Sequence, residues 1–333
     1  MEKKLIKGKS FLGLGILFFI LVLLIIFSGF FGTVSLSFRG ILSSEAEKTI
    51  FILRFKRILL GALVGGMLSL GGAILQAVLR NPLAEPYILG ISSGGGLGAV
   101  LFIILRSASF YYATLGLPLS AFLGSILSFL LVQRLAKVDG RLSPQNLLLS
   151  GVVVGIVLTN ILVFIGWFFE ERLIQGIIWW LLGNLDIMEN TALLIIGLIG
   201  LAGLLISLLF ARELNIISLG EEEAISLGIE VEKTKQLLIY ISSLLTATAV
   251  AFCGIIGFVG LIVPHIVRFF SGNEHRTLLP GSFLMGAIFI VLSDAFARTV
   301  LSPIEIPIGV ITALMGGPMF IFLLQRKKKI LFK

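Results

Sequence analysis

The sequence has few charged residues, and their scarcity decides the class of protein. Asp, Glu, Lys and Arg make up 13% of the 333 residues. Nine stretches of about 17 to 32 residues contain none of the four. A helix needs roughly 20 apolar residues to cross the hydrocarbon core, where every backbone N–H and C=O must be paired within the segment. These stretches exclude a water-soluble globular protein and predict an all-α, polytopic membrane protein.

Disulfides, nucleotide-binding loops and metal-ligand clusters are also missing from the sequence. Cys253 is the single cysteine, so no disulfide can form within the chain. The only Gly-Lys-Ser, at residues 8–10, has Lys3 where a phosphate-binding loop needs its first glycine. His265 and His275 have no cysteine or carboxylate nearby at ligand spacing. We therefore expect no catalytic residue, no metal site and no bound cofactor in this chain.

The nine stretches predict ten membrane spans, because one of them is too long for a single crossing. Residues 236–267 would form a helix of roughly 48 Å. Gly254, Gly257 and Gly260 lie near its middle and favour a turn there, and Pro264 is expected to end or kink the second half. The predicted spans are residues 10–38, 58–79, 86–105, 107–133, 142–169, 190–211, the two halves of 236–267, 277–293 and 306–325. Leu173–Leu185 is too short to span and carries Trp179 and Trp180, which favours a place at the interface.

The basic residues predict the orientation. Lys3, Lys4, Lys7 and Lys9 precede the first span, and residues 326–329 after the last span are all basic. The positive-inside rule then places both termini in the cytoplasm, which requires an even number of crossings and agrees with ten. The net charge of +8 is explained by basic residues at helix ends near anionic lipid, so no nucleic-acid partner is expected.

Acidic residues inside the predicted spans are scarce. Asp294 lies deep in a predicted helix, four residues before Arg298 on the same face. A structural ion pair between them is favoured over a role in a translocation path. Ion-coupled transporters usually need several intramembrane ionisable groups, so this class is kept only as the alternative.

Residues 214–232 form a cytoplasmic loop with a short predicted helix. Ser218-Leu219-Gly220-Glu221 has the pattern of a capping box, and Gly228 is placed to end the helix in a left-handed conformation. Such a short helix is unstable in water unless it packs on something. The local sequence leaves open whether it contacts a partner protein or only its own membrane domain.

A second cytoplasmic loop, residues 80–86, contains two prolines and is predicted to form a rigid turn. The glycine-rich residues 90–98 follow it. They allow the backbone to come close to a neighbouring helix or to a passing solute.

Further motifs are spread along nearly the whole chain. They are Leu53-Arg54-Phe55-Lys56-Arg57, Gly71 to Gln76, Asn81-Pro82-Leu83-Ala84-Glu85-Pro86-Tyr87-Ile88-Leu89-Gly90, Leu148 to Val152, Trp180 to Gly183, Leu219 to Gly228, Gly257 to His265 and Ile306 to Gly309. These motifs and their order resemble those of the FecCD-type permeases of ABC importers for iron-siderophores, haem and cobalamin.

The resemblance implies a single permease domain over residues 1–333 in the inner (cell) membrane, with ten helices per subunit. It implies a dimer, here expected to be a homodimer, with the translocation path at the subunit interface. A cytoplasmic ABC ATPase dimer would use ATP and Mg, and an extracytoplasmic substrate-binding protein would deliver the substrate. The residues expected to couple to the ATPase are Leu219, Gly220, Glu221, Glu222, Ala224, Leu227 and Gly228.

The resemblance also assigns two further sets of residues. Arg54, Arg57 and Arg298 match external arginines that dock the binding protein, although snorkelling at the interface is a competing explanation. Asn81 and Leu83 match a cytoplasmic gate. The family's second gate element would fall on Ser143-Pro144-Gln145, whose proline departs from the pattern, so it is not assigned.

The resulting functional hypothesis is a permease that imports a metal chelate, powered by a partner ATPase. An iron-siderophore is the commonest substrate in the family, with haem or cobalamin as further possibilities. The alternative is an ion-coupled secondary transporter that works without an ATPase. A membrane scaffold without a transported solute would lack a solvent-accessible path.

Overall fold

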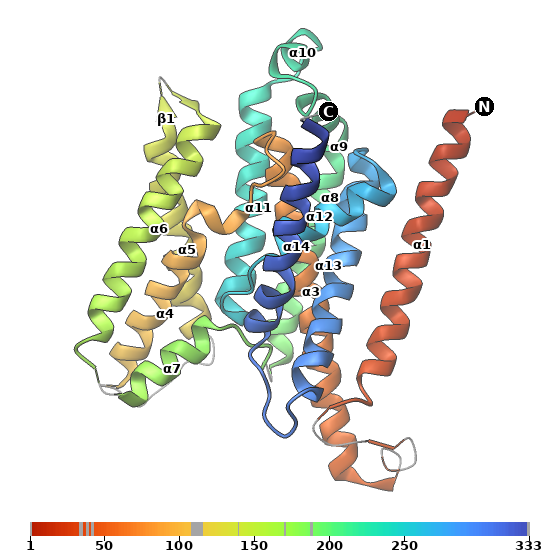
Figure 1. The fold of residues 1–333 in the computed structure, drawn as a ribbon. Helices are drawn as coiled ribbons and strands as arrows, with labels where there is room; N and C mark the ends of the chain where they lie inside the picture. Colours follow the sequence, from red (N-terminus) through yellow and green to blue (C-terminus); the bar gives the residue numbers. More distant parts are fainter. Residues whose placement is uncertain are drawn as a thin grey trace.

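The computed structural model describes residues 2–32, 36–37, 40, 43–107, 116–138, 140–169, 171–186 and 189–331. It is built almost entirely from helices (Figure 1), which confirms the all-α class. The helices are α1 Glu2–Ser28, α3 Glu45–Val78, η1 Pro86–Leu89, α4 Ile91–Ser107, α5 Gly116–Ala136, α6 Pro144–Gly166, α7 Glu171–Leu181, α8 Asn190–Leu209, α9 Ala211–Ile217, α10 Glu221–Ser226, α11 Val231–Cys253, α12 Val259–Ser271, α13 His275–Thr299 and α14 Ile308–Leu331. A two-residue hairpin pairs β1 Lys137–Val138 with β2 Arg141–Leu142 in antiparallel fashion.

The helices follow the predicted spans closely. Six helices in the described chain are long and apolar enough to cross a membrane, and each matches one predicted span: α3, α5, α6, α8, α11 and α13. Four shorter apolar stretches match the other four predicted spans. Leu12–Ser28, Ile91–Leu105 and Ile308–Phe322 fall within theirs, and Val259–Ser271 extends four residues beyond residue 267. The helices therefore lie where the apolar stretches predict them.

Helix α3 is the centre of the bundle. Its 34 residues make it roughly 51 Å long, and nearly all side chains from Leu60 to Val78 are buried. A Cβ at Gly65 would lie 2.2 Å from the carbonyl oxygen of Gly286 on α13, and a Cβ at Gly72 would lie 1.8 Å from that of Gly260 on α12. Only glycine permits such backbone contact, which is how these helices pack tightly without a hydrophobic drive from lipid.

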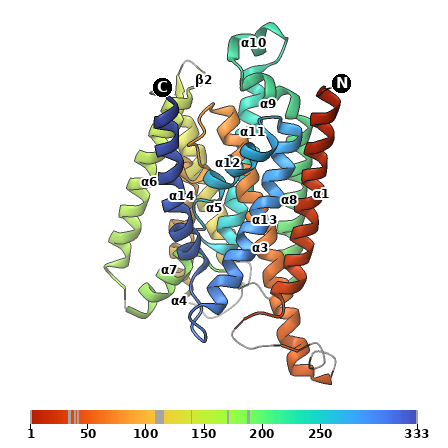
Figure 2. The same ribbon diagram turned by 45° about the vertical axis from the view of Figure 1, so that its right-hand side comes forward.

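The two ends of the bundle differ (Figures 1 and 2). Both termini, α10 and the β hairpin gather at one end, and α7 and the connection between α13 and α14 lie at the other. Trp179 on α7 is 57% exposed, whereas Ile177 is buried. The prediction of a short, non-spanning element at Leu173–Leu185 is confirmed, with the helix shifted slightly toward the N-terminus.

The long stretch at residues 236–267 divides into two helices, as predicted. Helix α11 ends at Cys253, Gly254 adopts a φ of 70°, and α12 begins after Phe258, which has a φ of 69°. A Cβ at Gly254 would lie 2.1 Å from the carbonyl oxygen of Trp180, so the site requires glycine for its close approach as well as its conformation. Pro264 does not end the second helix, which continues to Ser271.

Side chains from residues 76–87 pair with the backbone around this interruption, which we call the helix break (residues 254–258). The hydroxyl of Tyr87 accepts from Ile256 N and donates to Ile256 O, both at 3.1 Å. Glu85 accepts from Phe258 N at 2.9 Å. Gln76 donates to the carbonyl oxygens of Gly260 and Leu261 at 3.1 Å. Non-helical backbone inside a membrane protein is tolerated when it is paired in this way.

We predict that Tyr87→Phe destabilises the protein by about 1–3 kcal/mol, because it leaves both polar backbone atoms of Ile256 without their side-chain partner. The measurement is chemical unfolding in detergent. Thr299→Val is the control, because Thr299 is exposed and its hydroxyl bonds only carbonyl oxygens of its own helix, those of Ala295 and Phe296. Equal losses in the two variants would contradict the role given to Tyr87.

Candidate functional site

An ion-pair cluster lies at the end of the bundle that carries α7. Arg57 on α3 bonds Asp294 at 2.9 Å, Asp186 at 3.1 Å and Glu305 at 2.7 Å. Arg298 bonds the other oxygen of Asp294 at 2.9 Å, and both residues are at most 2% exposed. The predicted Asp294–Arg298 ion pair is confirmed. We call these five residues the arginine cluster.

Arg298 uses its remaining donors on the end of α1. It donates to the carbonyl oxygen of Phe31 at 2.8 Å and to the hydroxyl of Ser28 at 3.0 Å. Arg54 is also buried, at 8% exposure, with its guanidinium beside Gly32. The structure thus gathers all three predicted docking arginines at one end of the bundle, and it also gives Arg57 and Arg298 a structural role there.

Asp186 and Glu305 were missed by the sequence reasoning. They lie in two different connections, between α7 and α8 and between α13 and α14. The signal was present in the predicted topology, which puts both connections on the same side of the membrane as Arg54 and Arg57. Their side chains are 62% and 39% exposed, so Arg57 is paired with two solvent-accessible carboxylates.

The segment after α3 forms the predicted turn. Asn81 Oδ1 accepts from Leu83 N at 3.0 Å, and Asn81 O accepts from Ala84 N at 3.0 Å. Leu83 is 41% exposed, whereas Ala84 is fully buried. The two predicted gate residues therefore share one turn, and this turn leads directly to Glu85 and Tyr87 at the helix break. Their gating role stays a prediction.

The glycine-rich start of α4 packs against a neighbouring helix. A Cβ at Gly94 would lie 2.4 Å from the carbonyl oxygen of Gly124, and one at Gly98 would lie 2.2 Å from that of Ser120, both on α5. The sequence left open whether these glycines approach a neighbouring helix or a passing solute. At Gly94 and Gly98 the structure shows close approach to a neighbouring helix.

Residues 214–232 protrude at the end that holds both termini (Figure 1). We call them the coupling loop after the role that the resemblance implies, which stays a prediction. Ala224 of α10 is fully buried and packs with Ile217 and Val231. Leu219, Ile225 and Leu227 are 74%, 63% and 65% exposed. Gly228 has the predicted left-handed conformation, with a φ of 80°. The loop thus packs partly on its own domain and presents three large apolar side chains outward.

The predicted capping box is wrong. Helix α10 begins after Gly220 and has no side-chain cap. Ser218 donates to the carbonyl oxygen of Asn215, and the carboxylate of Glu221 pairs with Lys235 on α11. Lys235 is 3% exposed, and a buried ammonium needs a counter-charge, so this ion pair takes Glu221 away from the helix start.

A groove lies between α4 and α6, which we call the α4–α6 groove. Its volume is about 340 Å³. Its wall is mixed, because apolar side chains line it together with polar side chains and two glycines: Tyr87, Ile88, Val152, Ile156, Ser92, Ser93, Thr159, Asn160, Gly151 and Gly155. Two of the polar side chains are already paired, because Ser93 donates to the carbonyl oxygen of Gly90 and Asn160 donates to that of Ile156. The sequence reasoning assigned no role to these polar residues.

These features define an α-helical permease of the cell membrane, with an interrupted helix in its core and an apolar coupling loop at one end. The chain belongs to the FecCD transport family, whose model matches residues 20–326.

Two relatives and one solved structure that are similar to this chain are transport proteins. The chain is 41% identical over 286 residues to the cobalamin import system permease protein BtuC of Halobacterium salinarum, covering 85% of this chain and 75% of the relative. It is 35% identical to the hemin transport system permease protein HmuU of Yersinia pestis, covering 95% and 96%. A solved inward-facing conformation of a metal-chelate type ABC transporter matches with a TM-score of 0.84 and 33% identity, covering 94% of this chain and 98% of the other. The chain is therefore a transport subunit of this family.

We predict that Asp294→Asn costs about 3–5 kcal/mol of stability, because it leaves Arg298 buried without its counter-charge and removes one partner of Arg57. Unfolding in detergent measures the loss. Glu45→Gln is the matched control, because it breaks an exposed pair with Lys48 and should cost less than about 1 kcal/mol. A loss at Asp294 no larger than at Glu45 would show that the cluster is not structural.

A second prediction concerns pH. Desolvation raises the pKa of Glu85 from 4.5 to about 7, although the hydrogen bond from Phe258 N opposes the shift. The folded state then binds a proton that the unfolded state has already lost, so stability should fall as pH rises from about 4.5 to about 7.

The expected fall is on the order of 1–3 kcal/mol, because one pKa unit corresponds to about 1.4 kcal/mol and Glu85 is partly exposed. Glu85→Gln keeps an acceptor for Phe258 N and should remove this component. The exposed residue Glu222 supplies the control variant Glu222→Gln, which should leave the pH profile unchanged. The same profile in wild type and Glu85→Gln would refute the assignment.

Proposed function

We propose that two copies of this chain form the membrane passage of an ATP-driven importer for a metal chelate. A cytoplasmic ABC ATPase dimer would supply the energy, and an extracytoplasmic binding protein would deliver the chelate. The observation that carries the proposal is the coupling loop, which holds three exposed apolar side chains at the end of the bundle where both termini lie. Exposed apolar residues on and beside a six-residue helix are best explained by a partner that covers them.

The names of two relatives support the proposed substrate class. The proteins BtuC and HmuU are named for cobalamin and hemin, and both ligands are metal chelates of a large ring. We propose cobalamin and haem as the first substrates to test, with an iron-siderophore as the third. The α4–α6 groove would line the passage, since its wall combines hydroxyl groups with apolar side chains and so suits a chelate that has both kinds of surface.

The arginine cluster suggests how a binding protein would dock. The exposed carboxylates of Asp186 and Glu305 pair with Arg57, so acidic residues of a binding protein could replace them without leaving the guanidinium unpaired. Arg54 and Arg298 are buried at the same end of the bundle and would add to the positive electrostatic potential there. Such charges act mainly on the association rate and its salt dependence.

The inner mouth would be controlled by the turn that contains Asn81 and Leu83. Glu85 and Tyr87 connect this turn to the helix break, so a shift of α12 is expected to move the turn with it. ATP binding by the partner would shift the population between outward-open and inward-open states through contacts with the coupling loop.

The test is uptake by liposomes that contain the permease, the ATPase and the binding protein, with cobalamin, haem and an iron-siderophore as substrates. We expect uptake of at least one chelate that requires ATP, and none with an ATPase that cannot hydrolyse it. Uptake driven by an ion gradient without nucleotide would favour the alternative, an ion-coupled secondary transporter.

A variant of the coupling loop tests the partner directly. Leu219→Ser combined with Leu227→Ser should lower ATPase binding and uptake at least tenfold, because burying each leucine against a partner is worth about 1.5–3 kcal/mol. Val138→Ser is the control, since Val138 is 51% exposed in the hairpin at the same end. Unchanged ATPase binding in the double variant would contradict the proposal.

A further inference from the structure

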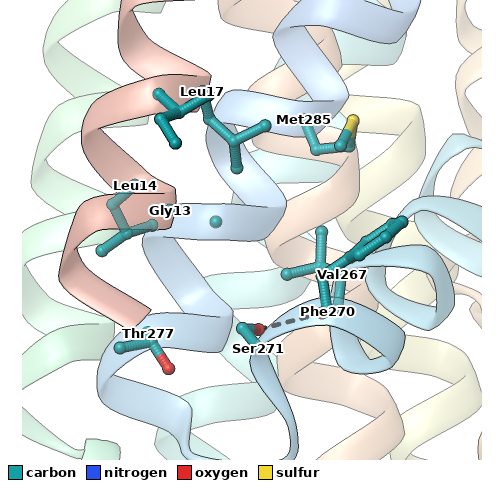
Figure 3. Close-up of a pocket in the computed structure, with 10 residues that line it drawn as sticks. Gly13, Leu14, Leu17, Val267, Phe270, Ser271, Thr277 and Met285 are labelled. Atoms are coloured by element: carbon teal, nitrogen blue, oxygen red, sulfur yellow. Dashed lines mark hydrogen bonds between the residues drawn. The ribbon is translucent and has the colours of Figure 1, made fainter. Parts of the chain in front are cut away.

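An apolar groove separates the N-terminal half of α1 from the rest of the bundle (Figure 3). Its volume is about 310 Å³. One wall is formed by Gly13, Leu14 and Leu17 of α1, and the other by residues of α12 and the first turns of α13. The residues of the second wall are Val267, Phe270, Ser271, Thr277, Gly281 and Met285.

The groove exists because α1 packs closely only along its second half. Leu17 and Leu21 contact an apolar cluster that includes Ile288 and Val291 of α13. Nearer the N-terminus, a Cβ at Gly13 would meet no atom within 4 Å. Figure 1 shows this part of α1 standing apart from α12 and α13.

The polar atoms in the groove are already paired. The hydroxyl of Ser271 donates to the carbonyl oxygen of Val267 at 2.9 Å, a bond drawn in Figure 3. The hydroxyl of Thr277 donates to the carbonyl oxygen of Glu274 at 3.0 Å. The groove therefore offers its occupant an apolar surface and no vacant hydrogen-bonding group.

Basic residues occur in both segments that flank the groove. The sequence places Lys3, Lys4, Lys7 and Lys9 on the three turns of α1 that precede Gly13, and the helical register puts position 9 one turn before Gly13 on the same face. Arg276 is exposed next to Thr277 on the opposite wall. An apolar slot inside the membrane with basic residues in its flanking segments matches a lipid that has an acyl chain and an anionic headgroup.

We propose that this groove is a binding site for an anionic phospholipid, with an acyl chain between α1 and α13 and the phosphate among the basic residues at the start of α1. The bound lipid fills the space that α1 leaves open and holds its N-terminal half against α12 and α13. This inference rests on membrane insertion of the chain and is independent of the transported substrate.

The test uses the full-length protein in phosphatidylcholine vesicles that contain a small fraction of photoactivatable phosphatidylglycerol, with the reactive group on the acyl chain. We expect crosslinks to α1, α12 and α13 at the groove. A phosphatidylcholine probe with the same reactive group should give at least tenfold fewer.

Two variants separate the acyl-chain contact from the headgroup contact. Gly13→Leu fills the groove without a clash and should reduce crosslinking at the groove at least fivefold. Gly15→Leu is its matched control, because Gly15 also has open space beside it but does not line the groove. Replacing Lys3, Lys7 and Lys9 with Gln leaves the groove intact and should reduce the preference for phosphatidylglycerol to less than threefold.

Three outcomes would overturn the proposal. Equal crosslinking by the two lipids would show contact with bulk lipid only. Equal effects of Gly13→Leu and Gly15→Leu would show that the groove holds no chain. Loss of all groove crosslinks in the assembled importer would show that a protein subunit occupies the groove instead. The lysine variant keeps the test decisive if Gly13→Leu fails to fold.

Discussion

The structure depends on pairing the backbone at the break between α11 and α12. An interrupted helix inside a membrane leaves N–H and C=O groups that neither water nor lipid can satisfy. Here the partners come from the end of α3 and the segment that links it to α4: Tyr87 bonds Ile256, Glu85 bonds Phe258, and Gln76 bonds the first turn of α12. The backbone N–H of Asn184 also donates to the carbonyl oxygen of Cys253 at 2.8 Å. This pairing joins three parts of the chain that are distant in sequence.

The same pairing connects the two functional ends. The segment that secures the break begins with the turn of Asn81 and Leu83 and follows directly from α3, which carries Arg57 of the arginine cluster at its other end. Helix α11 begins beside the coupling loop, where Lys235 pairs with Glu221. A force applied to the coupling loop therefore has a continuous route through packed helices to the break and the inner turn. Rigid elements of this kind are suited to movement between two discrete arrangements.

The sequence predicted the elements well where apolar length alone decides. The 32 uncharged residues from 236 to 267 exceed one crossing, and the glycines near their middle identified the break. Helix α3 begins 13 residues before its predicted span, at Glu45, because its first turns are charged and extend beyond the apolar stretch. Apolar length reports the membrane-embedded part of a helix and gives no information on an extension in water.

Side-chain partners were harder to predict, because they depend on tertiary contacts. Asp294 and Arg298 are four residues apart on one helix, so their ion pair followed from the sequence. Asp186 and Glu305 come from separate connections and could have been identified only from the topology. Glu221 was predicted to cap the start of its own helix, but it pairs with the buried Lys235 on α11. The α4–α6 groove has no local motif, since α4 and α6 each supply only part of its wall.

Hydrogen–deuterium exchange of the permease in lipid nanodiscs tests the account's central claim most directly. Peptides that cover residues 79–90 and residues 254–260 are compared, first in the permease alone and then in the complex with its ATPase before and after ATP. The account predicts slow exchange of the Ile256 and Phe258 amides in the permease alone, and a change in protection that occurs together in both peptides when ATP is added. Fast exchange at the break, or a response of one peptide without the other, would contradict it.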